Sequence, residues 1–206
     1  MLTMLRRGFF DKVGRDWEAA WTNNVTPWEL KSVNPSFVEG LSMVEHKGRA
    51  LVPGCGSGYD LLHLSTQGWS ATGLDISSTA VHQATKVVGD KCTLEQGDFY
   101  AYTCSEPYDL IYDYLFFAAI NPEMRQKCAQ QFHDLLTPKT GVLLTLLFPL
   151  KDPKSFDTNG PPYQLSLEDY QEIFKIAGLE LKTIATPKNS IKPRQGRELL
   201  AFWQRK

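Results

Sequence analysis

Residues 49–75 read RALVPGCGSGYDLLHLSTQGWSATGLD, and the order of apolar runs and glycines in this stretch decides the fold. A short apolar run leads into a turn with Gly54, Gly56 and Gly58, an apolar-periodic segment follows, and a second apolar run ends at Asp75. This order indicates a strand, a tight turn, a helix and a second strand. Glycines let the backbone approach a ligand closely, and a helix start exposes unpaired N–H groups. The stretch therefore predicts a nucleotide-binding turn.

The acid at the end of the second run strengthens this prediction. Asp75 follows Gly54 by 75 − 54 = 21 positions, where a carboxylate can accept hydrogen bonds from a ribose diol. The glycine spacing is G-x-G-x-G, and not the G-x-G-x-x-G of dinucleotide sites, which favours S-adenosylmethionine over NAD. The glycines alone are also compatible with a strand-to-helix turn that binds nothing.

Length and composition indicate one domain. The chain has 206 residues, of which 42% are hydrophobic, enough for one α/β domain with a core and too few for two ordinary domains. Helical and strand patterns alternate without an internal repeat. We expect a single domain over residues 1–206, with an N-terminal lid segment at 1–48, a cofactor-binding core at 49–150, and the substrate loop and last strands at 151–206.

Charge and cysteine usage exclude several classes of protein. The net charge is −1 and no basic run is interleaved with aromatic residues, so we expect no nucleic-acid partner. The longest apolar stretch, residues 141–150, is too short to span a membrane, and the N-terminus lacks the apolar core of a signal peptide. The four cysteines show no C-x-x-C or Cys/His ligand spacing. These features predict a cytoplasmic monomer without a metal site.

The remaining elements follow from periodicity, caps and breakers. We expect helices from Ser77 or Ser78 to Val87, from Asn121-Pro122 to Leu136, and from a capping box of Ser166 with Asp169 to Ala177. We expect strands at 93–96, 108–117, 141–150, 179–186 and 198–203.

Two acids lie at predicted strand ends, where ligands of open α/β sheets bind. Asp98 could accept a hydrogen bond from an adenine amino group, and Phe99 could supply a backbone donor and a ring face, although a glycine followed by an acid is also a common turn. Asp113 interrupts the apolar run 108–117, and a charge there is costly without a partner. We therefore expect Asp113 to face the amino acid end of the ligand or the reacting centre.

Three tryptophans precede the first core strand. Trp17 and Trp21 are four positions apart and share one face of a helix, and Trp28 follows a Thr-Pro break. Composition alone favours packing of these rings on the core. Alternatively, they belong to a lid that shields a sulfonium cation with aromatic faces.

The chain resembles the thiopurine methyltransferase superfamily, and most closely its halide/thiol methyltransferase branch. The resemblance runs from about residue 17 to the end of the chain. It is carried by W-E-A-A-W and T-P-W within 17–28, LVPGCGSGYD at 51–60, GLDIS at 73–77, GDFY at 97–100, YDYLFFAAI at 112–120, GPPYQLS at 160–166 and NSIKPRQGRELLAFW at 189–203.

The resemblance implies a Rossmann-like class I methyltransferase fold, with a seven-stranded, mostly parallel sheet, helices on both faces and an N-terminal helical lid. It implies S-adenosylmethionine as donor and S-adenosylhomocysteine as product, and it favours the lid interpretation of the tryptophans. Carried over by position, the cofactor contacts would be Trp17, Trp21, Trp28, Gly54, Gly56 (in the same turn), Asp75, Asp98, Phe99 and Tyr114. The loop before Gly160 and the LFFAAI motif depart from the family pattern, so the acceptor cannot be copied across.

Methyl transfer from a sulfonium is an in-line displacement, which needs the nucleophile within roughly 3–3.5 Å of the methyl carbon and water excluded. A thiolate, hydrosulfide, thiocyanate or halide acceptor needs no dedicated base. We expect Tyr163 to orient the acceptor and Arg194 or Arg197 to attract an anion, unless both arginines lie in a solvated loop.

Two alternatives remain open. An oxygen or nitrogen acceptor would need a base, for which Asp113 is the candidate. A domain that binds the cofactor without catalysis is the other, although the intact acids and glycines argue against it.

Overall fold

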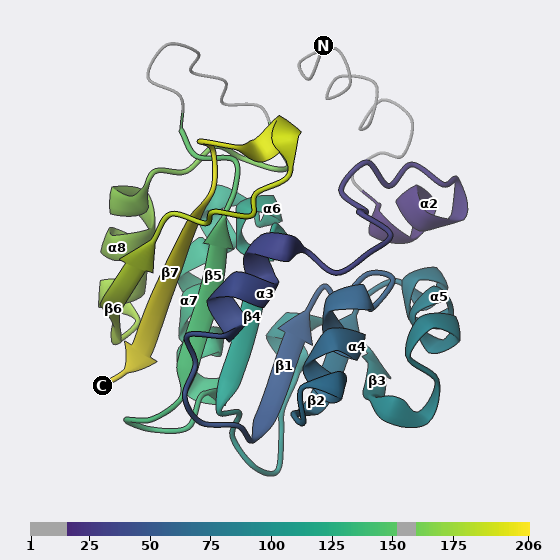
Figure 1. Cartoon of the computed structure of the whole chain (residues 1–206), viewed down its shortest axis with the longest axis horizontal. Helices are drawn as coiled ribbons and strands as arrows, with labels where there is room; N and C mark the ends of the chain where they lie inside the picture. Colours follow the sequence, from purple (N-terminus) through teal and green to yellow (C-terminus); the bar gives the residue numbers. More distant parts are fainter. Residues whose placement is uncertain (1–15, 152–159) are drawn as a thin grey trace.

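The computed structural model describes residues 16–151 and 160–206, and a seven-stranded sheet runs through their centre (Figure 1). The strand order is β3-β2-β1-β4-β5-β7-β6. β1 to β5 are parallel, whereas β7 runs antiparallel to both β5 and β6. The strands are β1 (Arg49–Pro53), β2 (Ser70–Asp75), β3 (Thr93–Gln96), β4 (Leu110–Tyr114), β5 (Val142–Leu147), β6 (Leu179–Ala185) and β7 (Leu199–Arg205). The predicted mostly parallel, seven-stranded α/β fold is confirmed.

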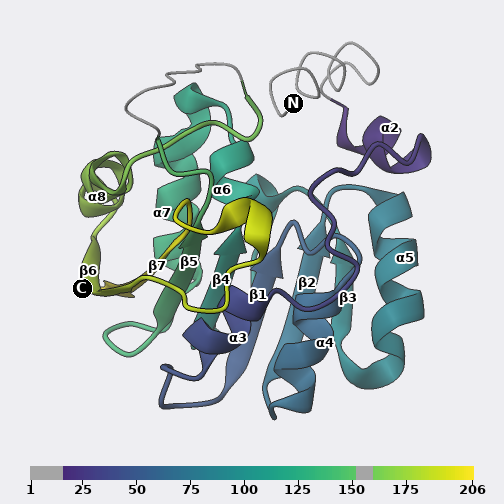
Figure 2. The ribbon, with the colours of Figure 1, turned by 45° about the horizontal axis from the view of Figure 1, so that its top comes forward.

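Helices cover both faces of the sheet (Figure 2). On one face lie α3 (Pro35–Leu41), α4 (Tyr59–Thr66) and α5 (Ser78–Val88), and on the other lie α6 (Phe116–Ala119), α7 (Arg125–Leu135) and α8 (Leu167–Ile176). Because side chains of a strand alternate, β4 sends Leu110 and Tyr112 into the first apolar layer and Ile111 into the second. Each layer forms its own buried cluster, as expected for a sheet covered on both sides.

Local signals placed several elements correctly. Ser77 caps α5 by accepting the amide of Ala80, and Ser166 and Asp169 form the predicted capping box of α8. The strand at 93–96 is confirmed with its predicted limits. Short 3₁₀ helices complete the described chain: η1 (Gly89–Lys91), η2 (Phe99–Ala101), η3 (Pro122–Met124) and η4 (Lys192–Arg194).

The apolar run 108–117 does not form one strand, contrary to expectation. β4 ends at Tyr114, Leu115 takes a left-handed conformation with φ of 61°, and α6 begins at Phe116. The bend is half-buried and its residues are apolar or aromatic like those of the strand, so composition alone could not show where the strand ends. Likewise, the helix expected from 122 to 136 begins as η3 before α7, and the strand expected at 141–150 ends at Leu147.

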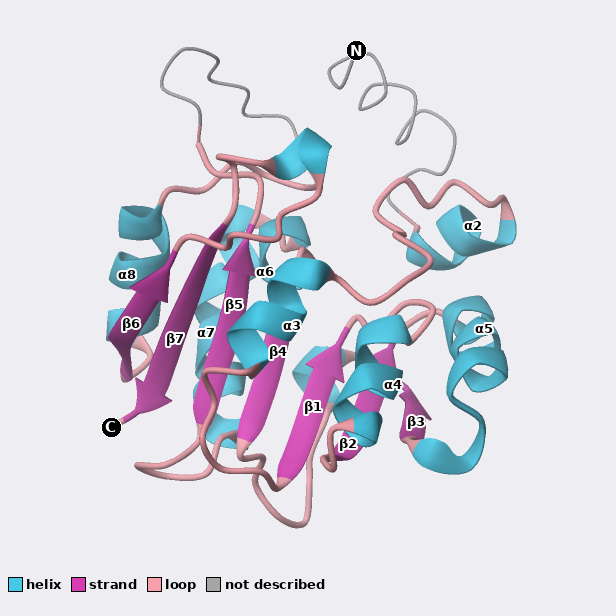
Figure 3. Ribbon diagram, viewed as in Figure 1, coloured by secondary structure: helices cyan, strands magenta, loops and turns pink. Residues whose placement is uncertain are grey.

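The carboxyl ends of the parallel strands meet at one edge of the sheet, beneath α2 (Trp17–Thr22) (Figure 3). α2 is anchored to the start of α5, where the Glu18 carboxylate accepts hydrogen bonds from the Ser77 and Thr79 hydroxyls and from the Thr79 amide. A carboxylate is favoured at this position because it faces the positive end of the α5 dipole. This contact holds the described part of the N-terminal segment over the edge where the site forms.

The turn after β1 requires glycine at Gly54, and this requirement can be tested. Gly54 has φ of 61°, and a Cβ there would lie 2.7 Å from the ring of Phe116. We expect Gly54→Ala to lower the free energy of unfolding by about 1–2 kcal/mol for the left-handed backbone and by about 1–3 kcal/mol more for the clash. Urea unfolding followed by circular dichroism measures the loss.

Gly196→Ala is the matched control, because Gly196 has φ of 72° and nothing within 4 Å of its Cβ position. Equal losses in the two variants would contradict the role given to the Phe116 contact.

Candidate functional site

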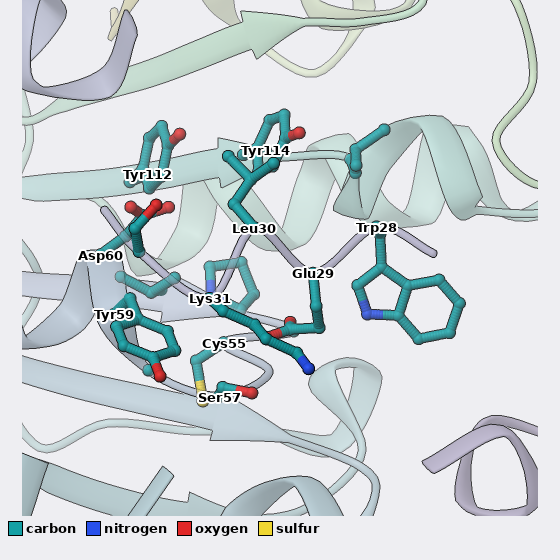
Figure 4. A pocket seen from close by; sticks show the side chains of 16 residues that line it. Trp28, Glu29, Leu30, Lys31, Cys55, Ser57, Tyr59, Asp60, Tyr112 and Tyr114 are labelled. Atoms are coloured by element: carbon teal, nitrogen blue, oxygen red, sulfur yellow. The ribbon is translucent and has the colours of Figure 1, made fainter. Parts of the chain in front are cut away.

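A cavity of about 70 Å³ lies at the carboxyl ends of β1 and β4 (Figure 4). Three segments line it: residues 28–32 between α2 and α3, the glycine turn with the start of α4, and the end of β4 with Tyr112, Tyr114 and Leu115.

The glycine turn is closed by the chain's own hydrogen bonds. The Asp75 carboxylate accepts the Gly56 amide at 3.0 Å and the Ser77 amide at 2.9 Å. Burial raises the pKa of Asp75, and these amides partly offset that rise. A carboxylate has further lone pairs, so the expected contact with a ribose diol remains a prediction. Asp75 does not belong to the lining of the cavity.

The three tryptophans meet beside this turn. Trp28 lines the cavity, and the rings of Trp17 and Trp21 meet it edge-on at centroid distances of 5.5 and 6.1 Å. Trp21 is buried, and its ring lies 3.3 Å from where a Cβ on Gly56 would be. The structure thus combines features of the packing and the lid interpretations: the three rings pack together, and one of them, that of Trp28, lines the cavity.

Asp98 and Phe99, which follow β3, do not line the cavity. Asp98 is exposed and caps η2 by accepting the Tyr100 amide at 2.9 Å. The Phe99 ring packs in the core against Phe116 and Phe132, so this ring is not exposed for stacking on a ligand. The Gly97 amide donates to the Asp75 carbonyl, which places this pair next to Asp75 at the sheet edge.

The pleat of β4 separates residues that the sequence suggested would act together. Tyr112 and Tyr114 both line the cavity, and neither buried hydroxyl has a hydrogen-bond partner among the described residues. Asp113 points to the opposite face, where its carboxylate accepts the Phe117 amide at 2.9 Å and caps α6. Burial raises the pKa of Asp113 to about 7. The structure does not bring Asp113 to the cavity, contrary to expectation.

The arginine loop lies over the other end of the site. Arg194 is buried, with its guanidinium carbon 5.1 Å from the Tyr114 ring and 4.9 Å from the Phe148 ring. Arg197 is half-buried and lies 5.4 Å from the same Phe148 ring. The solvated-loop alternative is therefore wrong for Arg194. The Glu198 carboxylate approaches Arg194 at 3.9 Å and accepts hydrogen bonds from two serine hydroxyls.

Tyr163 lies farther along the same edge and does not line the cavity. Its amide donates to the Ala118 carbonyl at 2.7 Å, and the Arg125 guanidinium lies 5.0 Å above its ring. The distinctive loop that precedes it falls mainly on residues 152–159, outside the described residues.

Three side chains at the site were missed by sequence reasoning: Glu29, Asp60 and Arg125. Glu29 and Asp60 line the cavity, and burial raises the pKa of both carboxyls. Their signal was present, since Glu29 directly follows Trp28 and Asp60 ends the glycine motif. Single acids in connecting segments and in first helical turns are so common that the pattern alone does not distinguish them.

The residues present fit a cationic nucleoside cofactor. The turn requires glycine at positions 54 and 56, and the ring of Trp28 lines the cavity. The buried hydroxyls of Tyr112 and Tyr114 have no hydrogen-bond partner among the described residues. Among the described residues no cluster of ligands suits a metal ion. No helix in the described ranges is long and apolar enough to cross a membrane.

Known proteins are similar in sequence to this chain over most of its length. The family model of thiopurine S-methyltransferase (TPMT) matches residues 13–206. A probable thiol methyltransferase 2 of Arabidopsis thaliana is 38% identical over 197 residues, covering 92% of this chain and 84% of the relative. Thiocyanate methyltransferase 1 of Brassica oleracea is 35% identical over 195 residues, with the same coverage of 92% and 84%.

Solved structures share the fold at low sequence identity. The glycopeptide N-methyltransferase MtfA complexed with S-adenosylmethionine matches with a TM-score of 0.71 at 14% identity, covering 86% of this chain and 96% of that one. A TehB-like methyltransferase from Corynebacterium glutamicum matches with a TM-score of 0.68 at 19% identity, covering 91% and 99%. With its glycine turn, its acids and this match over nearly the whole sequence, the chain belongs to the thiopurine S-methyltransferase family, and it is a class I S-adenosylmethionine-dependent methyltransferase.

Proposed function

We propose that the protein methylates a small, polarisable anion: a thiolate, hydrosulfide, thiocyanate or halide. The observation that carries this proposal is the buried Arg194 guanidinium, which lies 5.1 Å from the ring of the cavity-lining Tyr114 and has the Glu198 carboxylate 3.9 Å away. An arginine stays protonated in a protein, and its charge attracts an anion. The names of the thiol and thiocyanate methyltransferases that the chain resembles support the same acceptor class.

Methyl transfer to an anion requires the protein mainly to position the acceptor against the methyl donor. The cofactor supplies a methyl group on a positive sulfur that leaves as a neutral thioether. An anionic acceptor arrives without a proton to lose, so the residues need only align it, exclude water and neutralise its charge. Arg194 would hold the anion, and the rings of Trp28 and Tyr114 would close the cavity against water. Tyr163 and Arg197 remain proposed contacts of the acceptor.

We further propose that the whole chain, residues 1–206, forms one catalytic domain that acts as a cytoplasmic monomer without nucleic acid. Support comes from the single sheet and from four cysteines that are all unpaired thiols. Size-exclusion chromatography with light scattering tests the oligomeric state.

The acceptor class is tested with labelled S-adenosylmethionine and a panel of hydrosulfide, thiocyanate, iodide, an aryl thiol and a phenol. We expect transfer to the sulfur and halide members. We also expect Arg194→Gln to raise KM for thiocyanate at least tenfold, which corresponds to about 1.4 kcal/mol of lost binding. Lys192→Gln, an exposed cation of the same loop, is the control and should leave KM unchanged.

Each contrary result has a definite meaning. Transfer to the phenol alone would replace the anion proposal with an oxygen acceptor, which would need a base and would return Asp113 to consideration. Cofactor binding without transfer to any member would favour a non-catalytic domain.

Tyr163 has its own test. Tyr163→Phe keeps the ring beside Arg125 and removes only the hydroxyl. If that hydroxyl orients the acceptor, we expect kcat to fall several-fold with the dissociation constant of the cofactor unchanged. An unchanged kcat for every acceptor would remove Tyr163 from the mechanism.

Asp113 is expected to be structural. Its folded-state pKa of about 7 exceeds the unfolded value near 3.8, so its ionisation costs stability, and this cost grows as pH rises from about 4 to 7. We expect Asp113→Asn to make the free energy of unfolding less dependent on pH in this range, and to leave the KM for thiocyanate unchanged. Chemical denaturation at several pH values measures the first effect, and a kcat loss of a hundredfold or more with any acceptor would restore Asp113 as a base.

A further inference from the structure

Two acids at the cavity have no role in the mechanism described above. Glu29 belongs to the segment between α2 and α3, and Asp60 lies in the first turn of α4. Figure 4 shows both side chains at the cavity, with Glu29 beside Ser57 and Asp60 next to Tyr112. They come from parts of the chain that lie on either side of β1 in the sequence and meet only in the folded protein.

Asp60 is held in a defined orientation. Its Oδ1 accepts the Asn34 amide at 2.7 Å, which ties the start of α4 to the cap of α3. Burial raises the pKa of Asp60 to about 7, and the neighbouring carboxyl of Glu29 raises it further. The group is therefore costly to ionise in the free protein, as expected for a carboxylate that lacks a cation.

Glu29 lies directly on the glycine turn. Its Oε1 is only 2.5 Å from where a Cβ on Gly56 would be, so the contact depends on glycine at that position. Burial raises the pKa of Glu29, and hydrogen bonding from Ser57 partly offsets the rise. A carboxylate accepts up to about four hydrogen bonds, so Glu29 can bind Ser57 and a ligand together.

The two carboxyls lack an ion-pair partner in the described ranges 16–151 and 160–206. The charged groups that act on them at longer range are Lys31 on Glu29 and Arg194 on Asp60, besides the acids themselves and Asp75. A second observation points to a missing ligand: Tyr112 is 1% exposed and lines the cavity, yet its hydroxyl has no partner among these residues. Buried polar groups are rarely left unpaired.

We propose that Glu29 and Asp60 bind the α-ammonium group of the methionine part of the cofactor. An ammonium group has three N–H donors, and the cavity offers it two carboxylates and the Tyr112 hydroxyl oxygen. A sulfonium has no N–H or O–H to donate and is better accommodated by aromatic faces such as that of Trp28. The assignment rests on the cofactor dependence of the family and is independent of which acceptor is methylated.

The test is binding measured by calorimetry, without an acceptor. S-adenosylhomocysteine carries the ammonium but no sulfonium, 5′-methylthioadenosine carries neither, and S-adenosylmethionine carries both. We expect Asp60→Asn and Glu29→Gln each to weaken S-adenosylhomocysteine at least tenfold, in line with about 1.5–3 kcal/mol for a hydrogen bond to a charged group. Binding of 5′-methylthioadenosine should change less than twofold.

The pH dependence gives an independent measurement. Because the cation favours the ionised carboxylate, we expect affinity of the wild type for S-adenosylhomocysteine to rise between pH 5.5 and 7.5, and Asp60→Asn to flatten that rise. The matched control is Asp109→Asn at the opposite end of β4, where the carboxylate accepts the Arg49 amide and the Thr137 hydroxyl. It should change neither affinity nor its pH dependence.

Three results would overturn the assignment. Equal losses for S-adenosylhomocysteine and 5′-methylthioadenosine would mean that the acids only shape the glycine turn. A loss confined to S-adenosylmethionine would assign them to the sulfonium, and unchanged binding would remove them from the site. If Asp60→Asn fails to fold, Glu29→Gln, which lies outside the sheet and its helices, decides the question. Because no acceptor is present, a failed acceptor panel leaves this result intact.

Discussion

The Asp75 carboxylate is the interaction on which the site depends. It accepts the amides of Gly56 and Ser77, and so joins the turn after β1 to the start of α5 after β2. Ser77 in turn caps α5 and donates its hydroxyl to Glu18, which anchors α2. Without this carboxylate two buried amides would lack partners, at a cost of about 1–3 kcal/mol each. The glycine turn, α5 and the N-terminal segment therefore share one polar connection.

Charged groups of both signs lie in and beside the cavity. Glu29 and Asp60 line it, whereas the Arg194 guanidinium lies 5.1 Å from the ring of the lining residue Tyr114 and is paired with Glu198. Under the two proposals, the acids bind the cationic donor and Arg194 binds the anionic acceptor, which would hold both reactants in one orientation for an in-line displacement.

Strand β4 contributes side chains both to the cavity and to the packing of the opposite layer. Its Tyr112 and Tyr114 side chains face the cavity, and Asp113 between them caps α6 on the other face. A buried carboxyl is a frequent sign of function, but the Asp113 carboxylate accepts the Phe117 amide on the face away from the cavity. Cavity lining, more than burial alone, distinguishes Asp60 from Asp113, since burial raises the pKa of both to about 7.

Much of the site could be predicted because its signals are local. The glycine turn, the acid at the end of β2, the caps of α5 and α8 and the grouping of tryptophans all follow from residue types at short spacing. The face of the sheet to which Asp113 points could not be predicted. It depends on where β4 starts and ends, because side chains alternate between the two faces, and on the left-handed bend at Leu115.

The sequence by itself determined the glycine turn, the cofactor class and most strands and helices along the chain, since these rest on residue types at short spacing, although it did not reveal α3 or α6. Only the tertiary structure decided which charges meet. Glu29, Asp60 and Arg194 lie far apart in sequence, and the packing of α3, α4 and the last loop around β1 and β4 brings the two acids to one cavity and Arg194 to the ring of its lining residue Tyr114. Long-range proximity of this kind leaves no local pattern, because it arises from how the layers stack.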